Sequence, residues 1–339
     1  MDFCVFDCEL LSIITETQRR RGTQRSKRVN LLFSGAEREK ESMRVRVLLL
    51  CMFATALAAI VAAQQTDDTT RKLWDTAFVG PANKTNTHRR SRSYRIATPK
   101  VPIDKVAPDS VVGVTIWRLR PATAADSGER MIVHDETATK QWMPERISPE
   151  TKLGQGDKLR ISVEGARKGY LYVIDREQYA DGTLGEPYLI FPTTRTLNGD
   201  NRVDVGRLTE IPAQDDIPPY FTVRKSRPDH VAEVLSVLVT PTPLEGVAIG
   251  DKAQKLPEKQ VVEWEKEWSN GVGFLEMNKT VGQTWTKEER DAGAANTRAL
   301  TAEGPAPQLL FYRAAARPND PLFVKLQLWY RTPAKRSHH

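Results

Sequence analysis

The sequence predicts a mainly β protein: an antiparallel β-sandwich, Ig-like in layout, with a two-helix insertion before the last strands. Three observations support this fold class. Apolar and polar residues alternate with a period of two after about residue 110, Gly, Pro or Asp bounds each such stretch, and helical patterns are confined to about residues 250–305. About eight or nine short strands joined in sequence are typical of a sandwich. A closed β-barrel is the alternative that the same pattern allows.

The first strand is predicted in the stretch VVGVTIWRLRP. Val112, Val114 and Ile116 point to one side of it, and Pro121 ends it. The next strand follows the turn residues Gly-Gln-Gly-Asp and has one apolar face and one face predicted to meet water. The apolar residues are Leu159, Ile161 and Val163, and the polar ones are Lys158, Arg160, Ser162 and Glu164.

Residues 170–174 are apolar on both faces and predict a central strand. Asp181 and Gly182 predict a tight turn, and residues 188–191 predict a strand that Pro192 stops. Further strands are predicted at 202–205, 220–224, 233–240, 308–313 and 323–330.

Two helices are predicted inside the insertion. Pro257 suits the first turn before EKQVVEWEKEW, in which Trp264 and Trp268 form a stripe that we expect to dock onto the sheet. Thr286 and Glu289 have the spacing of a capping box at the start of the second helix.

Residues 43–63 have the pattern of a secretory signal peptide. A positive region after Met43 precedes an apolar stretch (47–60) and three small residues, which predicts cleavage before Gln64. Residues 1–42 contain a polybasic run and are interpreted as a mis-assigned upstream extension. If they are translated, the apolar stretch becomes a short signal anchor, and only then is contact with a membrane expected.

The rest of the chain is predicted to have three parts. Residues 64–110 are polar and lack an apolar period, so they are interpreted as a flexible tether, with a basic cluster at 87–95. Residues 111–332 form the sandwich, and 333–339 are a disordered tail. Ten of the Lys and Arg residues and seven of the Asp and Glu residues precede Gln64, so the net charge falls from +7 to +4 on cleavage. We therefore expect no nucleic-acid partner.

All three cysteines, Cys4, Cys8 and Cys51, precede the predicted cleavage site. The exported chain is therefore predicted to contain no thiol nucleophile, disulfide or cysteine metal site. An exported chain of this size without disulfides is commoner in bacterial envelopes than in eukaryotic secretion. The predicted location is the periplasm or the extracellular space.

A series of short motifs follows in fixed order: GDKLRISVEGARKGYLYVID, Asp-Gly, LIFPT, an Asn-containing loop, Ile-Pro and AEVLSVLVTPTPL. This series resembles the bacterial family called domain of unknown function 4384, over about residues 117–244. The resemblance implies a small β-rich module of exported proteins, also found attached to signalling domains such as kinases and caspase-like proteases. The shared motifs are structural ones, so the resemblance implies a fold and supplies no catalytic residues.

The sequence predicts no catalytic residues, cofactor or metal site. It contains neither a GxSxG nor an HExxH motif. His134, Asp135 and Glu136 are consecutive, and we interpret them as an exposed turn. Asp229 and His230 follow a proline and are interpreted as a solvated turn.

Tyrosines provide the candidate binding residues, because flat rings on a sandwich face can stack on sugars or accept peptide side chains. The four candidates are Tyr170, Tyr172, Tyr179 and Tyr188. The predicted function is a non-enzymatic interaction module of the bacterial envelope, with another envelope protein or a cell-wall polymer as its partner. The alternative is a carbohydrate-binding or sugar-active sandwich that uses these tyrosines. The oligomeric state stays open.

Overall fold

The computed structural model describes residues 94–96, 106–134, 139–205, 207–277, 280–295, 305–314, 317 and 319–331. The predicted signal peptide, the upstream extension, most of the tether and the C-terminal tail lie outside these residues. The chain divides into two units, 1–63 and 64–339, and every described element belongs to the second.

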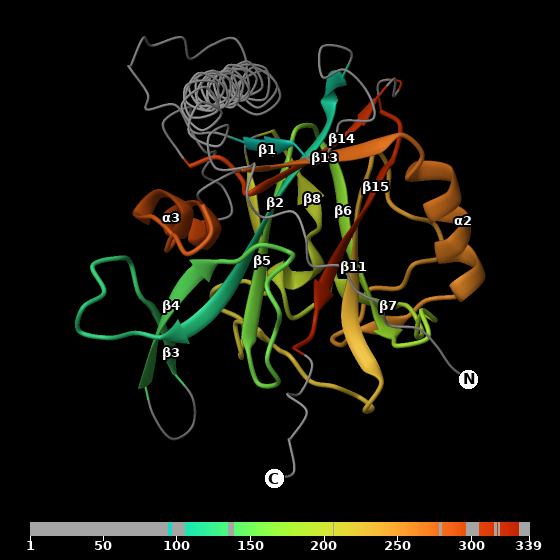
Figure 1. The fold of residues 1–339 in the computed structure, drawn as a ribbon. Helices are drawn as coiled ribbons and strands as arrows, with labels where there is room; N and C mark the ends of the chain where they lie inside the picture. Colours follow the sequence, from blue (N-terminus) through green and yellow to red (C-terminus); the bar gives the residue numbers. More distant parts are fainter. Residues whose placement is uncertain are drawn as a thin grey trace, which may run out of the picture. The chain divides into compact units, whose positions relative to one another are not determined.

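Two antiparallel β-sheets form the framework of the described chain and far outweigh its helices, which confirms the prediction of a mainly β fold (Figure 1). The first sheet consists of β1 (Tyr94–Ile96), β2 (Val106–Pro121), β3 (Met131–His134), β4 (Thr139–Arg146), β5 (Lys158–Gly165), β9 (Leu208–Ile211), β10 (Phe221–Thr222), β13 (Val272–Met277) and β14 (Leu309–Ala314). The second consists of β6 (Gly169–Tyr179), β7 (Tyr188–Phe191), β8 (Arg202–Val203), β11 (His230–Thr240), β12 (Gln254–Lys255) and β15 (Leu322–Trp329).

The long strand β2 organises the first sheet. One of its edges pairs with β5, and the other pairs with β14 in its first half and with β4 in its second half. Beyond β5 come β9 and β10, which form one edge of this sheet. In the second sheet the order β12-β7-β6-β11-β15 places β12 and β15 at the two edges.

The main core lies between the two sheets and contains the apolar faces that the alternating pattern predicts. Each such side chain contributes about 1.5–3 kcal/mol when it is fully buried. Fully buried members of this core include Val114, Ile116, Val163, Leu171, Val173 and Phe191.

A second apolar cluster joins helix α2 (Glu258–Trp268) to the outer face of the second sheet. Trp264 and Val261 of the helix pack with Tyr172 and Phe323 of the sheet. The rings of Trp264 and Trp268 are stacked, with their centroids 5.8 Å apart. The prediction that this tryptophan stripe docks onto the sheet is therefore confirmed for Trp264, which is 9% exposed.

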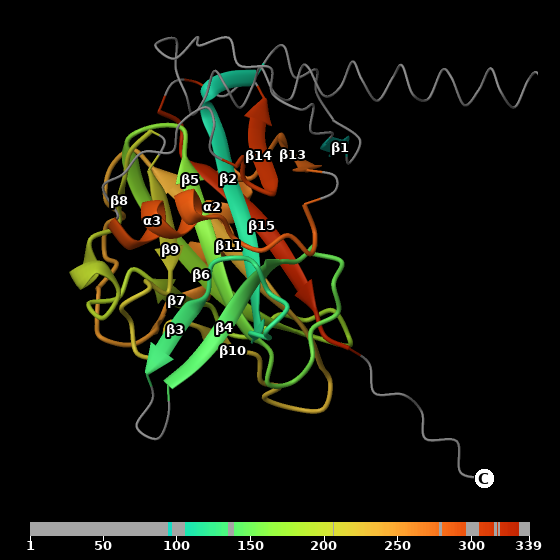
Figure 2. The ribbon, with the colours of Figure 1, turned by 90° about the vertical axis from the view of Figure 1, so that its left-hand side faces the viewer.

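The polar face of β5 does not meet water, and this prediction was wrong. Arg160, Ser162 and Glu164 are each at most 3% exposed. Helix α3 (Lys287–Ala295) lies against β9 on this side of the first sheet (Figure 2). Because alternation along β5 reports only polarity, it cannot distinguish a solvated face from one whose charges are paired beneath a helix.

The insertion at about 250–305 is not wholly helical. It contains α2 and α3 as predicted, but β12 precedes α2 and β13 lies between the helices. Strand β13 pairs with β14, which comes later in the chain. The prediction of a flexible tether at residues 64–110 was also wrong in two places. Strand β1 lies within that range and pairs with β13, and β2 already begins at Val106. Both errors concern backbone pairing with distant segments, which local composition does not encode.

The capping box of α3 is confirmed. The backbone N–H of Thr286 donates to the Glu289 carboxylate at 2.9 Å, and the N–H of Glu289 donates to the Thr286 hydroxyl at 3.2 Å. Replacing Thr286 by alanine is expected to lower the free energy of unfolding by about 1 kcal/mol. Urea denaturation checks this, with Lys287→Ala in the exposed first turn as the control. Equal stabilities of the two variants would contradict the capping role.

No helix among the described residues is both long enough and apolar enough to span a lipid bilayer.

Candidate functional site

The four candidate tyrosines do not form one surface. Tyr172 is 3% exposed and packs beneath α2, so the prediction that it is a surface residue was wrong. The Tyr179 ring lies 3.3 Å from the guanidinium carbon of Arg227, and Tyr188 is 44% exposed on β7. Tyr170 lies at the start of β6 and lines a hollow described below.

The interpretation of His230 as a solvated residue was wrong, because its side chain is fully buried at the start of β11. Its Nδ1 accepts a hydrogen bond from the N–H of Ser226 at 3.3 Å, and its Nε2 lies 3.0 Å from the carbonyl oxygen of Ala232. These contacts fit a neutral imidazole with its proton on Nε2. Burial lowers the pKa of His230, which favours the same neutral form.

Carboxyl groups surround His230 at this end of the sandwich. Burial raises the pKa of Asp175 to about 7, and the nearby charge of Glu177 adds to this shift. Burial also raises the pKa of Glu233 to about 9, with Asp175 as the next cause. The hydroxyl of Tyr330 donates to Glu233. The pKa of Glu233 therefore favours its protonated form at neutral pH.

This acidic cluster does not line either of the pockets described below. His134 lies on β3 in the other sheet, and Asp135 and Glu136 lie outside the described residues. Within the described ranges, no group of three or more His, Cys, Asp or Glu side chains is placed to hold a metal ion.

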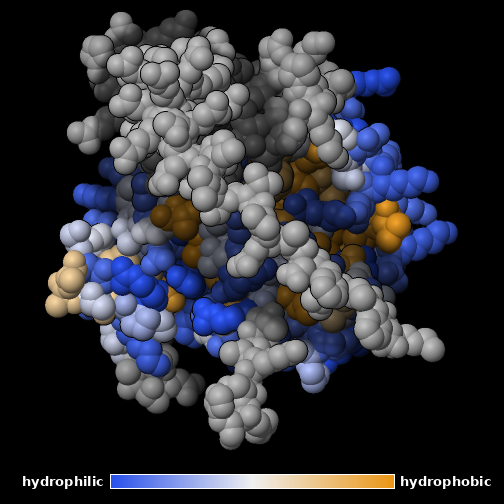
Figure 3. All heavy atoms as spheres, viewed as in Figure 1, coloured by the Kyte–Doolittle hydropathy of each residue, from blue (hydrophilic) through white to orange (hydrophobic). Residues whose placement is uncertain are grey.

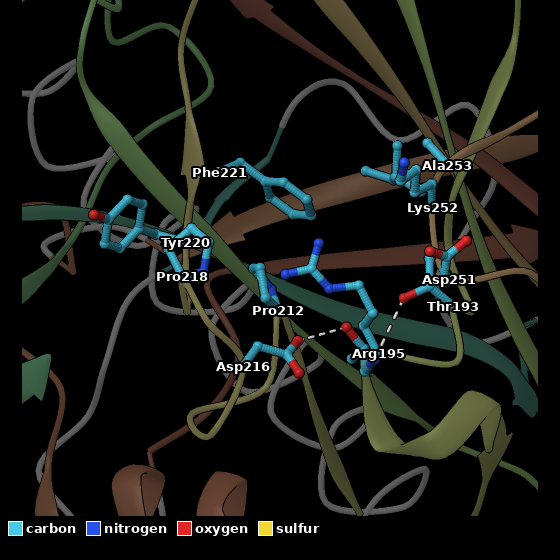
Figure 4. A pocket seen from close by; sticks show the side chains of 12 residues that line it. Thr193, Arg195, Pro212, Asp216, Pro218, Tyr220, Phe221, Asp251, Lys252 and Ala253 are labelled. Atoms are coloured by element: carbon cyan, nitrogen blue, oxygen red, sulfur yellow. Dashed lines mark hydrogen bonds between the residues drawn. The ribbon is translucent and has the colours of Figure 1, made fainter. Parts of the chain in front are cut away.

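An open groove of about 360 Å³ lies at the side of the sandwich where β10 and β12 form edges of the two sheets (Figure 4). We call it the loop groove, because three loops contribute most of its wall. The first of these loops follows β7, the second follows β9 and the third precedes β12. Its lining residues are Ile190, Thr193, Arg195, Thr196, Pro212, Asp216, Pro218, Tyr220, Phe221, Asp251, Lys252 and Ala253.

Hydrogen bonds join these loops to one another. The hydroxyl of Thr196 donates to Asp216 at 2.5 Å, and the guanidinium of Arg195 donates to the carbonyl oxygen of Ile217 at 2.5 Å. The N–H of Thr194 donates to the carbonyl oxygen of Gly250 at 2.8 Å. Because each bond joins two loops, the wall of the groove is formed before any ligand arrives.

Apolar and cationic groups face one another across the groove. The ring of Phe221 and the guanidinium of Arg195 point into the same space, with Lys252 on the far wall (Figure 4). The ring of Tyr220 points away from this space, and the ammonium of Lys158 lies 4.0 Å from its centroid there.

The carboxylate of Asp216 is bound by the loops, and burial raises its pKa. The exposed carboxylate of Asp251 also lines the groove, so two cations and two carboxylates face a ligand there beside the apolar ring. Such a site favours a ligand with both an apolar group and hydrogen-bonding groups.

Exposed apolar residues lie next to the loop groove. Ile217, beside the lining residue Pro218, is 75% exposed, and Ile249, two residues before Asp251, is 41% exposed. On the face of the molecule that Figure 3 shows, both hydrophilic and apolar areas are present among the described residues. Exposed apolar side chains beside a pocket can add to the surface that a ligand contacts.

A second, more polar hollow of about 690 Å³ surrounds the start of β6 and β8. Tyr170, Lys168, Arg202 and Arg207 contribute to its lining. Two of these cations already have carboxylate partners: Arg202 binds Asp200 at 2.8 Å, and Lys168 lies 3.9 Å from Asp204. We call this site the basic hollow.

No protein family, curated protein or solved structure matches this chain in the comparisons with known proteins. The resemblance to domain of unknown function 4384 therefore stays a prediction.

The sequence did not identify the loop groove. Its wall combines residues from positions near 195, 220 and 252, and only the folded sheets bring these loops together. One signal was present, since the segment IPAQDDIPPYF combines prolines, aromatics and acids between two strands. Loops of this composition at a sheet edge are common places for binding residues.

Proposed function

We propose that this protein is a non-enzymatic interaction module of the bacterial envelope, and that it holds another envelope protein in the loop groove. The observation that carries the proposal is a preformed groove in which Phe221, Arg195 and Lys252 face a common open space. Export to the periplasm or beyond is part of the proposal and is supported by the signal-peptide pattern of residues 43–63. Membership of the domain of unknown function 4384 family is supported by the order of the motifs alone.

A pull-down from envelope extract tests the proposal, with the full exported chain as bait. We expect at least one protein to be captured by the wild type and lost from the variant Arg195→Glu/Lys252→Glu. The matched control is Lys259→Glu/Lys266→Glu on the exposed face of α2, which changes the net charge equally. Capture that is identical for all three baits would contradict a role for the groove.

A carbohydrate ligand is the second candidate function, and the position of Tyr170 in the basic hollow supports it. Aromatic rings beside hydrogen-bonding cations suit acidic sugars. In this case Tyr170→Ala is expected to abolish binding on a glycan array, while Tyr188→Ala on β7 leaves it unchanged. Absence of glycan binding by the wild type would exclude this candidate.

A further inference from the structure

Helix α3 is held on the first sheet mainly by charged and small residues. Its Glu289 carboxylate forms an ion pair with Arg146 of β4. The apolar cluster between the helix and the sheet contains only two buried residues among those described, Ala292 of α3 and Leu208 of β9. Helix α2, by contrast, docks through a much larger apolar cluster. The docking of α3 therefore depends strongly on the charges beneath it.

Glu164 lies in the sheet beneath α3. It is paired across the strands with Leu208, the residue that contacts Ala292, and on its other side with Gly113 of β2. Side chains paired in this way lie on one face of a sheet, so the Glu164 carboxyl group is on the α3 side. The side chain is almost fully buried, and its Oε2 atom has no hydrogen-bond partner among the residues that the structure describes.

The buried charges on this side of the sheet do not balance. Among the described residues, three carboxyl groups (Glu164, Glu210 and Glu289) are buried there with two guanidinium groups (Arg146 and Arg160). Arg146 is paired with Glu289, and Arg160 with Glu210, so Glu164 is the carboxyl group without a cation of its own. Burial raises the pKa of Glu164 to about 8, the charge of Glu289 adds to this shift and that of Arg146 opposes it.

The backbone of α3 lies directly on this layer. A Cβ atom at Gly293 would come within 2.2 Å of the Glu210 side chain, so only glycine lets the helix approach this closely. Ionisation of Glu164 adds a negative charge here that no cation offsets. Repulsion between buried charges is strong, and departure of the helix would let water solvate the carboxylates.

We propose that ionisation of Glu164 releases α3 from the first sheet, so that the helix is a pH-dependent cover over the buried Arg160–Glu210 pair. The neutral carboxyl group permits docking at low pH, and the charged carboxylate disfavours it at high pH. A rise in pH therefore exposes a charged surface on β5 and β9. This device is independent of the function proposed for the loop groove.

The direction of the pH dependence follows from the two states of Glu164. Its pKa is about 8 beneath the docked helix, whereas a carboxyl group that meets water ionises near 4.5. Docking is therefore most favourable below about pH 4.5 and is lost as the pH rises toward and through about 8. Because one proton leaves, the equilibrium constant for release rises about tenfold for each pH unit between these two values.

Hydrogen exchange measured by mass spectrometry tests this proposal, on the full exported chain between about pH 5.5 and about pH 7.5. After correction for the intrinsic effect of pH on exchange, the protection of α3 is expected to fall about tenfold per pH unit. Strand β11 of the second sheet reports on global unfolding and is expected to stay better protected than α3 at every pH. In Glu164→Gln the protection of α3 is expected to be constant over this range. The matched control Glu288→Gln removes an exposed carboxylate from α3 and is expected to behave as the wild type does.

Three results would overturn the proposal. Protection of α3 that does not change with pH in the wild type would show that the helix stays docked whatever the charge beneath it. The same pH dependence in Glu164→Gln would assign the effect to another group. Equal protection of α3 and β11 would mean that the helix leaves only when the whole fold unfolds. The first and third results come from the wild type alone, so they do not depend on how well a variant folds.

Discussion

Replacing Arg160 by methionine is expected to destabilise the folded protein by about 3–5 kcal/mol, because this change leaves the Glu210 carboxylate buried without its cation. Arg160 is 1% exposed, and its guanidinium donates to Glu210 at 2.5 Å and to the carbonyl oxygen of Pro219 at 2.8 Å. Burial lowers the pKa of Arg160 and raises that of Glu210, while the attraction between the two charges opposes both shifts. Chemical denaturation measures the loss.

The double variant Arg160→Met/Glu210→Leu separates the cost of an unpaired charge from the cost of lost packing. Replacing a buried ion pair by apolar residues of similar volume is often nearly neutral. We therefore expect the double variant to recover most of the stability that Arg160→Met loses. A loss below about 1 kcal/mol for Arg160→Met would contradict the burial of this pair beneath α3.

Stability is expected to fall as the pH rises from about 5 to about 8, because burial raises the pKa of Glu164 to about 8. In the unfolded chain this carboxyl ionises near its ordinary value of 4.5, whereas in the folded chain it stays protonated. Its contribution is fully present below the unfolded-state pKa and is lost as the pH rises toward and through the folded-state pKa. At about 1.4 kcal/mol for each pKa unit, the loss is on the order of 4 kcal/mol.

The variant Glu164→Gln isolates this effect, since glutamine does not ionise. Asp175 and Glu233 also have raised pKa values. The pKa of His230 is lowered, so its contribution to the free energy of unfolding rises with pH instead of falling. These groups are present in both proteins, so the difference in unfolding free energy between Glu164→Gln and wild type reports on Glu164. We expect it to grow in favour of the variant between about pH 5 and about pH 8. A difference that does not change with pH would mean that Glu164 is ionised in the fold.

The sequence predicted the class of fold well, because the features that define a strand are local. Alternation placed Val114 and Ile116 in the core, and the stripe of Trp264 predicted the docking of α2. The Thr286 capping box is also local, and its hydrogen bonds are present. Each of these features depends on residues within about one or two turns of helix or one strand.

Features that depend on distant pairing were not predictable in the same way. The polar residues of β5 appear solvated in the sequence, but Arg160 is paired with a residue fifty positions later. His230 follows a proline and resembles a turn residue, yet Tyr330 lies with its ring 4.7 Å from the imidazole. The candidate tyrosines were chosen by type, and Tyr172 shows that type alone does not separate a binding residue from a core residue.

Site-specific photo-crosslinking in the intact cell tests the central claim, that the loop groove holds a partner, most directly. A photoreactive phenylalanine analogue replaces Ile217 beside the groove in one strain and Val262 on α2 in a control strain, since both side chains are exposed. The account predicts a discrete crosslinked protein from the strain altered at Ile217, and its loss when Arg195→Glu/Lys252→Glu is added. Identical products from both strains, or no product at Ile217, would contradict it.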